Sequence, residues 1–220
     1  MSCEEFINTY WSQYILLEKE FVATLHYLSL DSENENAFSQ AYAKLILELG
    51  SEIDVVLKLY CQNIDKSFKG KDMGRYKACI QYCNPDFIKQ SVEEKITHRV
   101  LNPWIEWGDS SKNTLCWWKA YNKVKHSRTE LSEIDNVKKL SYKFANQKYT
   151  LLALAGLYQI LIYKYYQLAI EENKKILTPL PGSHLFQLKG GMWDSIDFWD
   201  ESAFYVENGD ICIESSVLHY

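Results

Sequence analysis

The stretch that decides the fold is residues 146–175, NQKYTLLALAGLYQILIYKYYQLAIEENKK. Apolar residues recur in it at steps of three and four and fill much of the space between, so a helix built from it is apolar around most of its girth. Other elements must enclose such a helix, and we therefore predict that it forms the centre of the core. The apolar run from Leu151 to Tyr163 contains Gln159 and stops at Lys164, which makes it too short and too polar to cross a bilayer.

Helical periodicity also dominates the chain before this central helix. Gly50 interrupts one of the predicted helices and costs about 1 kcal/mol relative to Ala in a helix interior. A glycine kept at that cost indicates close packing of another helix, or a bend. The helices predicted before the central one cover about residues 4–29, a stretch from the polar cluster 31–34 to about Lys66 that includes Gly50, about residues 75–84, and a segment that begins near Lys112.

Three segments lack a helical stripe of apolar residues. We expect residues 86–110 to form an irregular insertion with one short hairpin, and residues 127–145 to form a polar connection. In the tail, Asn208-Gly209 suits a two-residue type I′ turn between two short strands. The expected fold class is therefore all-α, with a helical domain over 1–177 (insertion about 86–110) and a tail over 178–220 that carries a hairpin at about 203–214.

Composition sets limits on function. The chain has 220 residues, 47% of them hydrophobic and 15% aromatic, which is typical of one folded domain of ordinary size. The net charge of −5 gives no whole-protein attraction to nucleic acid or anionic membrane, so such contacts must come from a local basic patch. The N-terminus is acidic and lacks the features of a signal peptide. We expect a cytoplasmic protein with no membrane association.

Several common catalytic motifs are absent. The sequence has no G-x-G-x-x-G or Walker loop, no H-E-x-x-H and no G-x-S-x-G. Its five histidines are far apart in sequence, and its six cysteines form no C-x-x-C pair. Nucleotide-binding, zinc-hydrolase and serine-hydrolase functions of the usual types are therefore excluded, and we expect no metal and no cofactor.

The candidate functional residues lie in residues 117–128, WWKAYNKVKHSR. Asn122 and His126 are four residues apart, so on a helix they project from one face. His126 can act as general acid or base near neutral pH, and Asn122 can orient it or bond to a phosphate oxygen. Neighbouring cations can stabilise charge on phosphorus, namely Lys123, Lys125 and Arg128. The same residues also suit a solvated helix C-terminus, where cations are favourable.

The N-x-x-x-H step at Asn122 and His126, on a helix before a final long apolar helix, resembles the motif of HEPN domains. A second similarity is the acidic segment at residues 48–54, with Glu52, because HEPN proteins often carry an acidic residue facing the motif. The resemblance covers about residues 35–175. It implies an antiparallel helical bundle that forms a homodimer, with two motif copies in one basic cleft. Many HEPN domains are metal-independent endoribonucleases of toxin–antitoxin and defence systems, in which a 2′-hydroxyl attacks the adjacent phosphate, whereas others do not cleave RNA.

One position departs from the pattern of active members, which usually place Arg immediately before the polar residue. Here that position is Tyr121, and losing a guanidinium would raise the barrier by about 2–4 kcal/mol, by analogy with an oxyanion-hole donor. Arg128 can replace it if the helix ends before Arg128 and the side chain folds back.

The resemblance leaves two functions open. In the first, His126 and Asn122 are catalytic, an RNA substrate contacts Lys123, Lys125, Arg128, Tyr121 and Glu52, and a cognate antitoxin protein is a partner. In the second, favoured by Tyr121, a non-catalytic dimer binds RNA, a nucleotide or a protein. A structural helical protein whose motif match is accidental is a third alternative.

Overall fold

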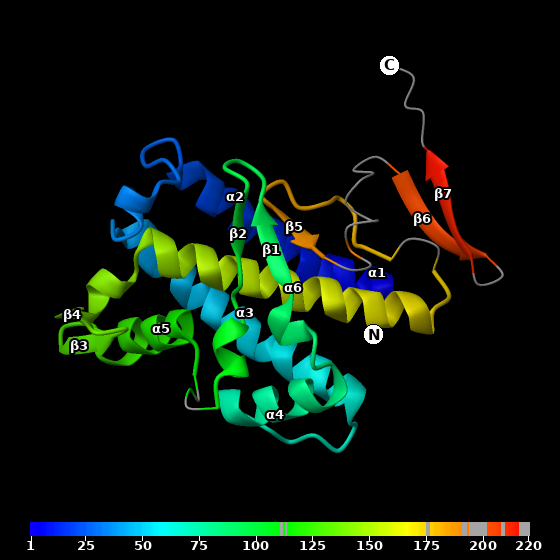
Figure 1. Cartoon of the computed structure of the whole chain (residues 1–220), viewed down its shortest axis with the longest axis horizontal. Coiled ribbons are helices and arrows are strands. Elements are labelled where there is room, and N and C mark those ends of the chain that lie inside the picture. The colour runs from blue at the N-terminus through cyan, green and yellow to red at the C-terminus, as the bar shows by residue number, and fades with distance from the viewer. Residues whose placement is uncertain are drawn as a thin grey trace.

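The architecture comes from a computed structural model, which is mostly helical with small antiparallel sheets (Figure 1). It describes residues 1–110, 112, 114–174, 177–190 and 193, and the backbone of 202–207 and 210–215. The helical class predicted from periodicity is thus confirmed, with more β-structure than expected. The helices are α1 (Cys3–Phe6), α2 (Ser12–Thr24), α3 (Gln40–Ile64), α4 (Met73–Cys83), α5 (Cys116–His126) and α6 (Gln147–Glu171).

The first predicted helix differs in detail from the observed one. A π-helical segment, Ile7–Trp11, separates α1 from α2, and α2 ends at Thr24 rather than near residue 29. The π segment keeps the chain helical while changing the direction of successive side chains. Phe6, just before the segment, and Trp11, its last residue, are both buried, so both aromatic rings reach the core across the interruption.

Helix α6 lies at the centre of the core, as its sequence predicts. Its middle is buried on every side, including polar side chains that such a position usually excludes. Gln159 is fully buried and its Nε2 donates to the carbonyl oxygen of Phe87 at 2.6 Å. Burial also lowers the pKa of the Lys164 ammonium.

The long helices are not all antiparallel. Helix α2 runs antiparallel to α3, but α3 and α6 run in the same direction. At their N-terminal ends Gln147 Nε2 lies 3.5 Å from Tyr42 Oη, and near their C-terminal ends Asn63 Nδ2 donates to Glu171 Oε1 at 2.9 Å. The long connection between α3 and α6 returns the chain to the starting end, which makes the parallel arrangement possible. The fully antiparallel expectation is therefore wrong for this pair.

Residues 86–110 contain the expected hairpin, β1 (Ser91–Glu94) and β2 (Arg99–Leu101). A third strand, β5 (Phe186–Lys189), pairs antiparallel with β1 and gives the sheet order β2-β1-β5. The segment is also less peripheral than an irregular insertion, because Trp104 and Trp107 are fully buried. The sequence boundary at residue 178 falls before β5, which belongs to this sheet.

Residues 127–145 hold a hairpin that periodicity did not predict. Strands β3 (Leu131–Ile134) and β4 (Val137–Leu140) pair around Asp135 and Asn136, which both have positive φ. Asp and Asn tolerate that left-handed conformation, which a type I′ turn requires. The polar-connection expectation is therefore incomplete. In the tail, β6 (Ser202–Glu207) and β7 (Asp210–Ser215) form the predicted hairpin.

Two helical glycines hold α5 against the two longest helices. A Cβ atom on Gly50 would lie 2.3 Å from Cδ2 of Tyr121, and one on Gly156 would lie 3.4 Å from Cζ2 of Trp117. The first distance is a steric overlap, so Tyr121 occupies the space above Gly50. The close packing that Gly50 indicated in the sequence is present, and α5 supplies it.

A buried carboxylate fixes the segment before β5. Glu18 on α2 is 2% exposed and accepts hydrogen bonds from the Tyr14 hydroxyl at 2.7 Å and from the backbone N–H groups of His184 and Leu185, each at 3.1 Å. The Ser183 hydroxyl is a fourth donor. Burial, and then the nearby Glu18, raise the pKa of Tyr14. These bonds fasten the chain after α6 to the first helices.

The two glycines predict opposite effects of the same substitution. Gly50→Ala gains about 1 kcal/mol of helix propensity but forces a methyl group into Tyr121, and overpacking of this kind costs about 1–3 kcal/mol. We expect a net loss of stability, whereas Gly156→Ala, with ordinary contact distances, should be neutral or stabilising. Urea denaturation measures both, and equal stability of the two variants would contradict the tight contact at Gly50.

Glu18→Gln should lower the free energy of unfolding by about 2–4 kcal/mol, because an amide would present N–H groups to donors that now bond to a carboxylate. The matched control is Glu20→Gln on the same helix, whose pair with Lys44 at 2.8 Å is exposed to solvent, so its loss should change the free energy of unfolding little. Trypsin cleavage at Lys189 should accelerate in Glu18→Gln alone. Similar losses in both variants would refute the role of Glu18.

Candidate functional site

Helix α5 carries Asn122 and His126 away from the core. Asn122 is half-buried and His126 is exposed at the last residue of the helix. The basic side chains of the last turn stand near the unpaired carbonyl groups of the helix end, where positive charge is favourable. The inward-facing residues follow at helical steps and are all buried, namely Trp117, Ala120, Tyr121 and Val124.

Tyr121, immediately before Asn122, is a buried residue of α5. It is 5% exposed, packs on Gly50 and lies 4.7 Å from the Trp118 ring, centroid to centroid. Its hydroxyl accepts a hydrogen bond from Lys125 Nζ at 3.0 Å, and the same ammonium lies 5.2 Å from the ring centroid. Tyr121 therefore serves the α3–α5 contact and orients Lys125.

The polar groups around His126 bond to the backbone of their own helix. Asn122 Nδ2 donates to the Trp118 carbonyl at 3.1 Å, and Arg128 Nε donates to the Val124 carbonyl at 3.4 Å. Arg128 thus folds back along a helix that ends before it. The His126 side chain makes no hydrogen bond or ion pair within the described part of the chain, so no such neighbour fixes the orientation of its imidazole.

The acidic segment of α3 divides between two sides of that helix. Asp54, one turn beyond Gly50, accepts a hydrogen bond from Tyr76 Oη at 3.2 Å and interacts electrostatically with Lys125. Glu52, two residues from Gly50, projects from the opposite side of the helix. Burial, and then the nearby Glu48, raise the pKa of Glu52. The structure therefore brings Asp54, and not Glu52, towards the motif helix.

A wider group of cations surrounds the end of α5. Residues 119–148 contain eight Lys or Arg and three Asp or Glu in a chain of net charge −5. We call their surface the basic end. Helix α5 and the β3–β4 hairpin lie together at one end of the molecule (Figure 1), and the Tyr142 N–H donates to the Arg128 carbonyl at 3.0 Å. The α5 cations therefore continue into the hairpin and the 3-10 helix after it, Ser141–Phe144.

Three lysines around that 3-10 helix act on one another electrostatically, namely Lys139, Lys143 and Lys148. Burial, and then Lys143 and Lys148, lower the pKa of Lys139. The Lys139 ammonium bonds to Asn36 Oδ1 at 3.4 Å and lies 4.8 Å from the Phe144 ring centroid. The positive charges of Lys143 and Lys148 thus act on Lys139, and a bound anion would offset this repulsion.

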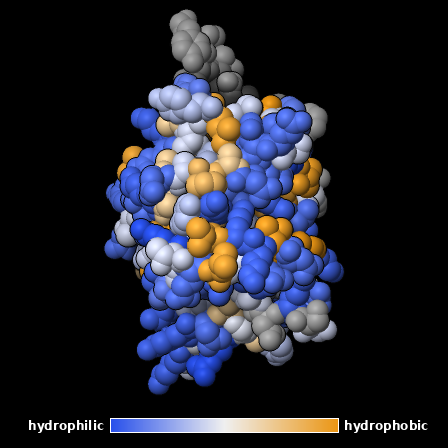
Figure 2. All heavy atoms as spheres, turned by 90° about the vertical axis from the view of Figure 1, so that its left-hand side faces the viewer, coloured by the Kyte–Doolittle hydropathy of each residue, from blue (hydrophilic) through white to orange (hydrophobic). Residues whose placement is uncertain are grey.

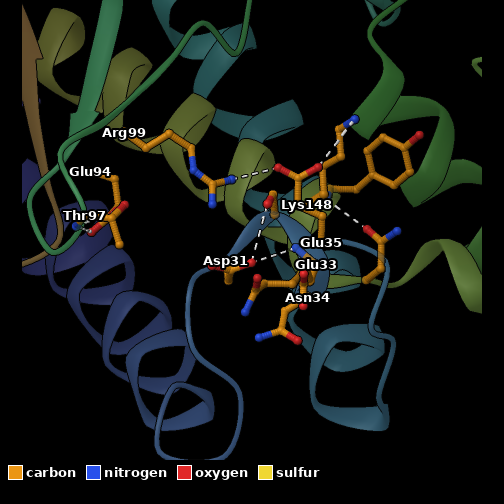
Figure 3. Close-up of polar contacts among 12 residues, drawn as sticks. Asp31, Glu33, Asn34, Glu35, Glu94, Thr97, Arg99 and Lys148 are labelled. Atoms are coloured by element: carbon orange, nitrogen blue, oxygen red, sulfur yellow. Dashed lines mark hydrogen bonds and ion pairs between the residues drawn. The ribbon is translucent and has the colours of Figure 1, made fainter.

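Glu35 borders the lysines and is itself paired with cations. Figure 3 shows Glu35 between Arg99 and Lys148. Its carboxylate accepts from Arg99 at 2.8 Å and lies 4.0 Å from Lys148 Nζ. Because Arg99 offsets its charge, Glu35 cancels little of the positive charge of Lys139 and Lys143.

The surface of this end is mainly hydrophilic. Figure 2 faces the side of the molecule where the hairpin lies and shows small, separate hydrophobic groups among hydrophilic side chains. Exposed apolar residues of the segments there include Phe38, Leu131 and Val137. The candidate residues predicted from the sequence end at Arg128 and do not include the lysines of residues 138–148. Charge clustering over residues 138–148 was the available signal.

Other classes of site receive no support from the described residues. Among them, no three His, Cys, Asp or Glu side chains converge as ligands for a metal ion, and no helix is long and apolar enough to span a membrane. The chain matches no family model, and no curated protein or solved structure is significantly similar to it.

The two acids of α3 should respond oppositely to neutralisation. Folding raises the pKa of Glu52, so the protein loses stability as pH rises from the unfolded-state pKa of this carboxyl through its folded-state pKa. At pH 7 Glu52→Gln should therefore stabilise the protein, by less than about 1 kcal/mol at this half-exposed site. Asp54→Asn should destabilise it by about 1 kcal/mol, because it weakens the contacts to Tyr76 and Lys125. Urea denaturation at pH 7 and pH 4 tests this. The benefit of Glu52→Gln should shrink at pH 4, and a destabilised Glu52→Gln would place Glu52 beside a cation.

Proposed function

We propose that the protein binds RNA through the basic end. The observation that carries this proposal is charge segregation, with eight cations against three acids in residues 119–148 of an acidic chain. Phosphate contacts of Lys and Arg supply most of the sequence-independent affinity for nucleic acid. The position of the N-x-x-x-H step at the exposed end of α5, beside this surface, supports a HEPN-like module.

Non-catalytic binding is the activity that the geometry favours. Tyr121 is buried in the place of the expected guanidinium, and the Asn122 amide donates to its own helix. General acid–base catalysis needs an oriented imidazole within reach of the proton that it moves. His126 has exposure but no hydrogen-bonded neighbour in the described part of the chain.

One observation favours the endoribonuclease alternative. Arg128 folds back along α5, which is the condition under which it can replace the missing guanidinium near His126. A homodimer belongs to both functions, because two copies of α5 in one cleft would combine two basic ends.

Charge reversal at the basic end should separate specific from general electrostatics. Lys138→Glu with Lys143→Glu should weaken RNA binding more than about tenfold and lower the salt slope by about 1.4, as expected for two lost single-strand phosphate contacts. The matched control, Lys66→Glu with Lys71→Glu, changes the net charge equally in the α3–α4 loop and should have little effect. Fluorescence anisotropy at several salt concentrations measures both, and equal losses would contradict the assigned surface.

Incubation of the bound RNA distinguishes the two activities. We expect intact RNA, and His126→Ala should bind RNA as the unmodified protein does. Cleavage that persists in EDTA, leaves cyclic-phosphate ends and disappears in His126→Ala would overturn non-catalytic binding and establish the endoribonuclease.

A further inference from the structure

An exposed aromatic pair lies within the basic end. The Phe38 ring is 46% exposed and meets the half-buried Tyr142 ring edge to face, with centroids 5.5 Å apart. Aromatic side chains usually bury such area in a core or an interface. Phe38 instead remains partly accessible, next to Lys143.

The backbone holds both rings in place. Phe38 forms a β-bridge with Asn146, and the Gln147 N–H donates to the Ala37 carbonyl at 3.0 Å. Tyr142 is held from the other side, because its N–H donates to the Arg128 carbonyl. The segment before α3 and the segment before α6 are therefore tied together, and the rings project from a pre-organised support.

A lysine ammonium lies over both rings of the pair. Lys143 Nζ lies 5.5 Å from the Phe38 ring centroid and 5.9 Å from that of Tyr142. The Lys139 ammonium bonds to Asn36 Oδ1, two residues before Phe38, at 3.4 Å. The surface thus combines a partly exposed aromatic pair with a lysine that lies over the rings and can turn to a phosphate, as in sites where bases stack and phosphates are neutralised.

We infer that Phe38 and Tyr142 form a stacking platform, with Lys143 over the rings and Lys139 at Asn36 beside them, that makes the basic end select single-stranded RNA over duplex RNA. This inference rests on the proposed RNA binding and adds the substrate class and the residues that read it. A single strand offers unstacked bases to the rings, whereas a duplex hides its base faces and offers only phosphates and groove edges. A partner that presented carboxylates alone would use the lysines and leave the rings uncovered.

The experiment compares a labelled oligoadenylate of about 12 nucleotides, within the range of single-strand site sizes, with an RNA duplex of equal length. The unmodified protein should bind the single strand more tightly. Phe38→Ala should weaken single-strand binding about 5- to 150-fold, the range for loss of one stacked base, and leave duplex binding unchanged. Phe38→Leu keeps an apolar side chain without a flat ring and should show a similar loss. Tyr82→Ala removes a ring that is 91% exposed on α4 and is the matched control.

The outcomes separate the platform from the proposed function. Salt-sensitive binding of both RNAs that is unaffected by Phe38→Ala would overturn the platform and leave RNA binding standing. Absence of binding to either RNA would overturn both. Wild-type affinity of Phe38→Leu would replace stacking by simple apolar contact, and Phe38-dependent binding of an oligoglutamate peptide would identify an acidic protein partner instead. Unchanged thermal unfolding of Phe38→Ala confirms that the variant is folded, and oligodeoxyadenylate shows whether the 2′-hydroxyl contributes.

Discussion

Enclosure of α6 is the constraint on which the rest of the structure depends. A helix that is apolar around its girth leaves no face for solvent, so the other elements must cover it from several directions. Helices α2 and α3 pack along it, and the aromatic residues of the 86–110 segment cover it near Gly156. The long return of the chain between α3 and α6 also follows from this demand, since α3 and α6 run in the same direction. Burial is complete enough that even the Lys164 side chain lies inside.

Helix α5 is placed by what α3 and α6 leave open. Gly50 and Gly156 remove side chains where Tyr121 and Trp117 approach, and these contacts fix which residues of α5 face inward. Helical geometry then determines which residues face outward, because the position next to a buried residue points towards the edge of the buried face. The exposure of His126 and the half-burial of Asn122 are thus consequences of core packing. Tyr121, which makes the α3–α5 contact, immediately precedes Asn122 in the sequence.

The sequence predicted the parts of the fold that depend on local periodicity. The central helix, the early long helices and the tail hairpin each carry their own repeating pattern or turn dipeptide, and each is present. The relative direction of α3 and α6 was predicted wrongly, and the β3–β4 hairpin was not predicted. The first depends on contacts between residues far apart in sequence, and the second on Asp135-Asn136, a turn with a weaker signal than Asn-Gly. For the candidate site, spacing predicted one helix face but not the orientation of Glu52, because an acid two residues from the contact glycine points to the other side.

The burial pattern of α5 supports the proposed binding surface better than a catalytic centre. Catalysis needs several groups held in one geometry by a surrounding shell, and the interior of α5 is given to Trp117, Tyr121 and Val124. Binding of a phosphate backbone needs only cations on a stable support and tolerates mobile side chains. The basic end meets that lesser requirement, since α5, the β3–β4 hairpin and the 3-10 helix after it are joined by backbone hydrogen bonds such as Tyr142 to Arg128. A second protomer would have to supply orientation to His126 before the same surface could become a cleavage site.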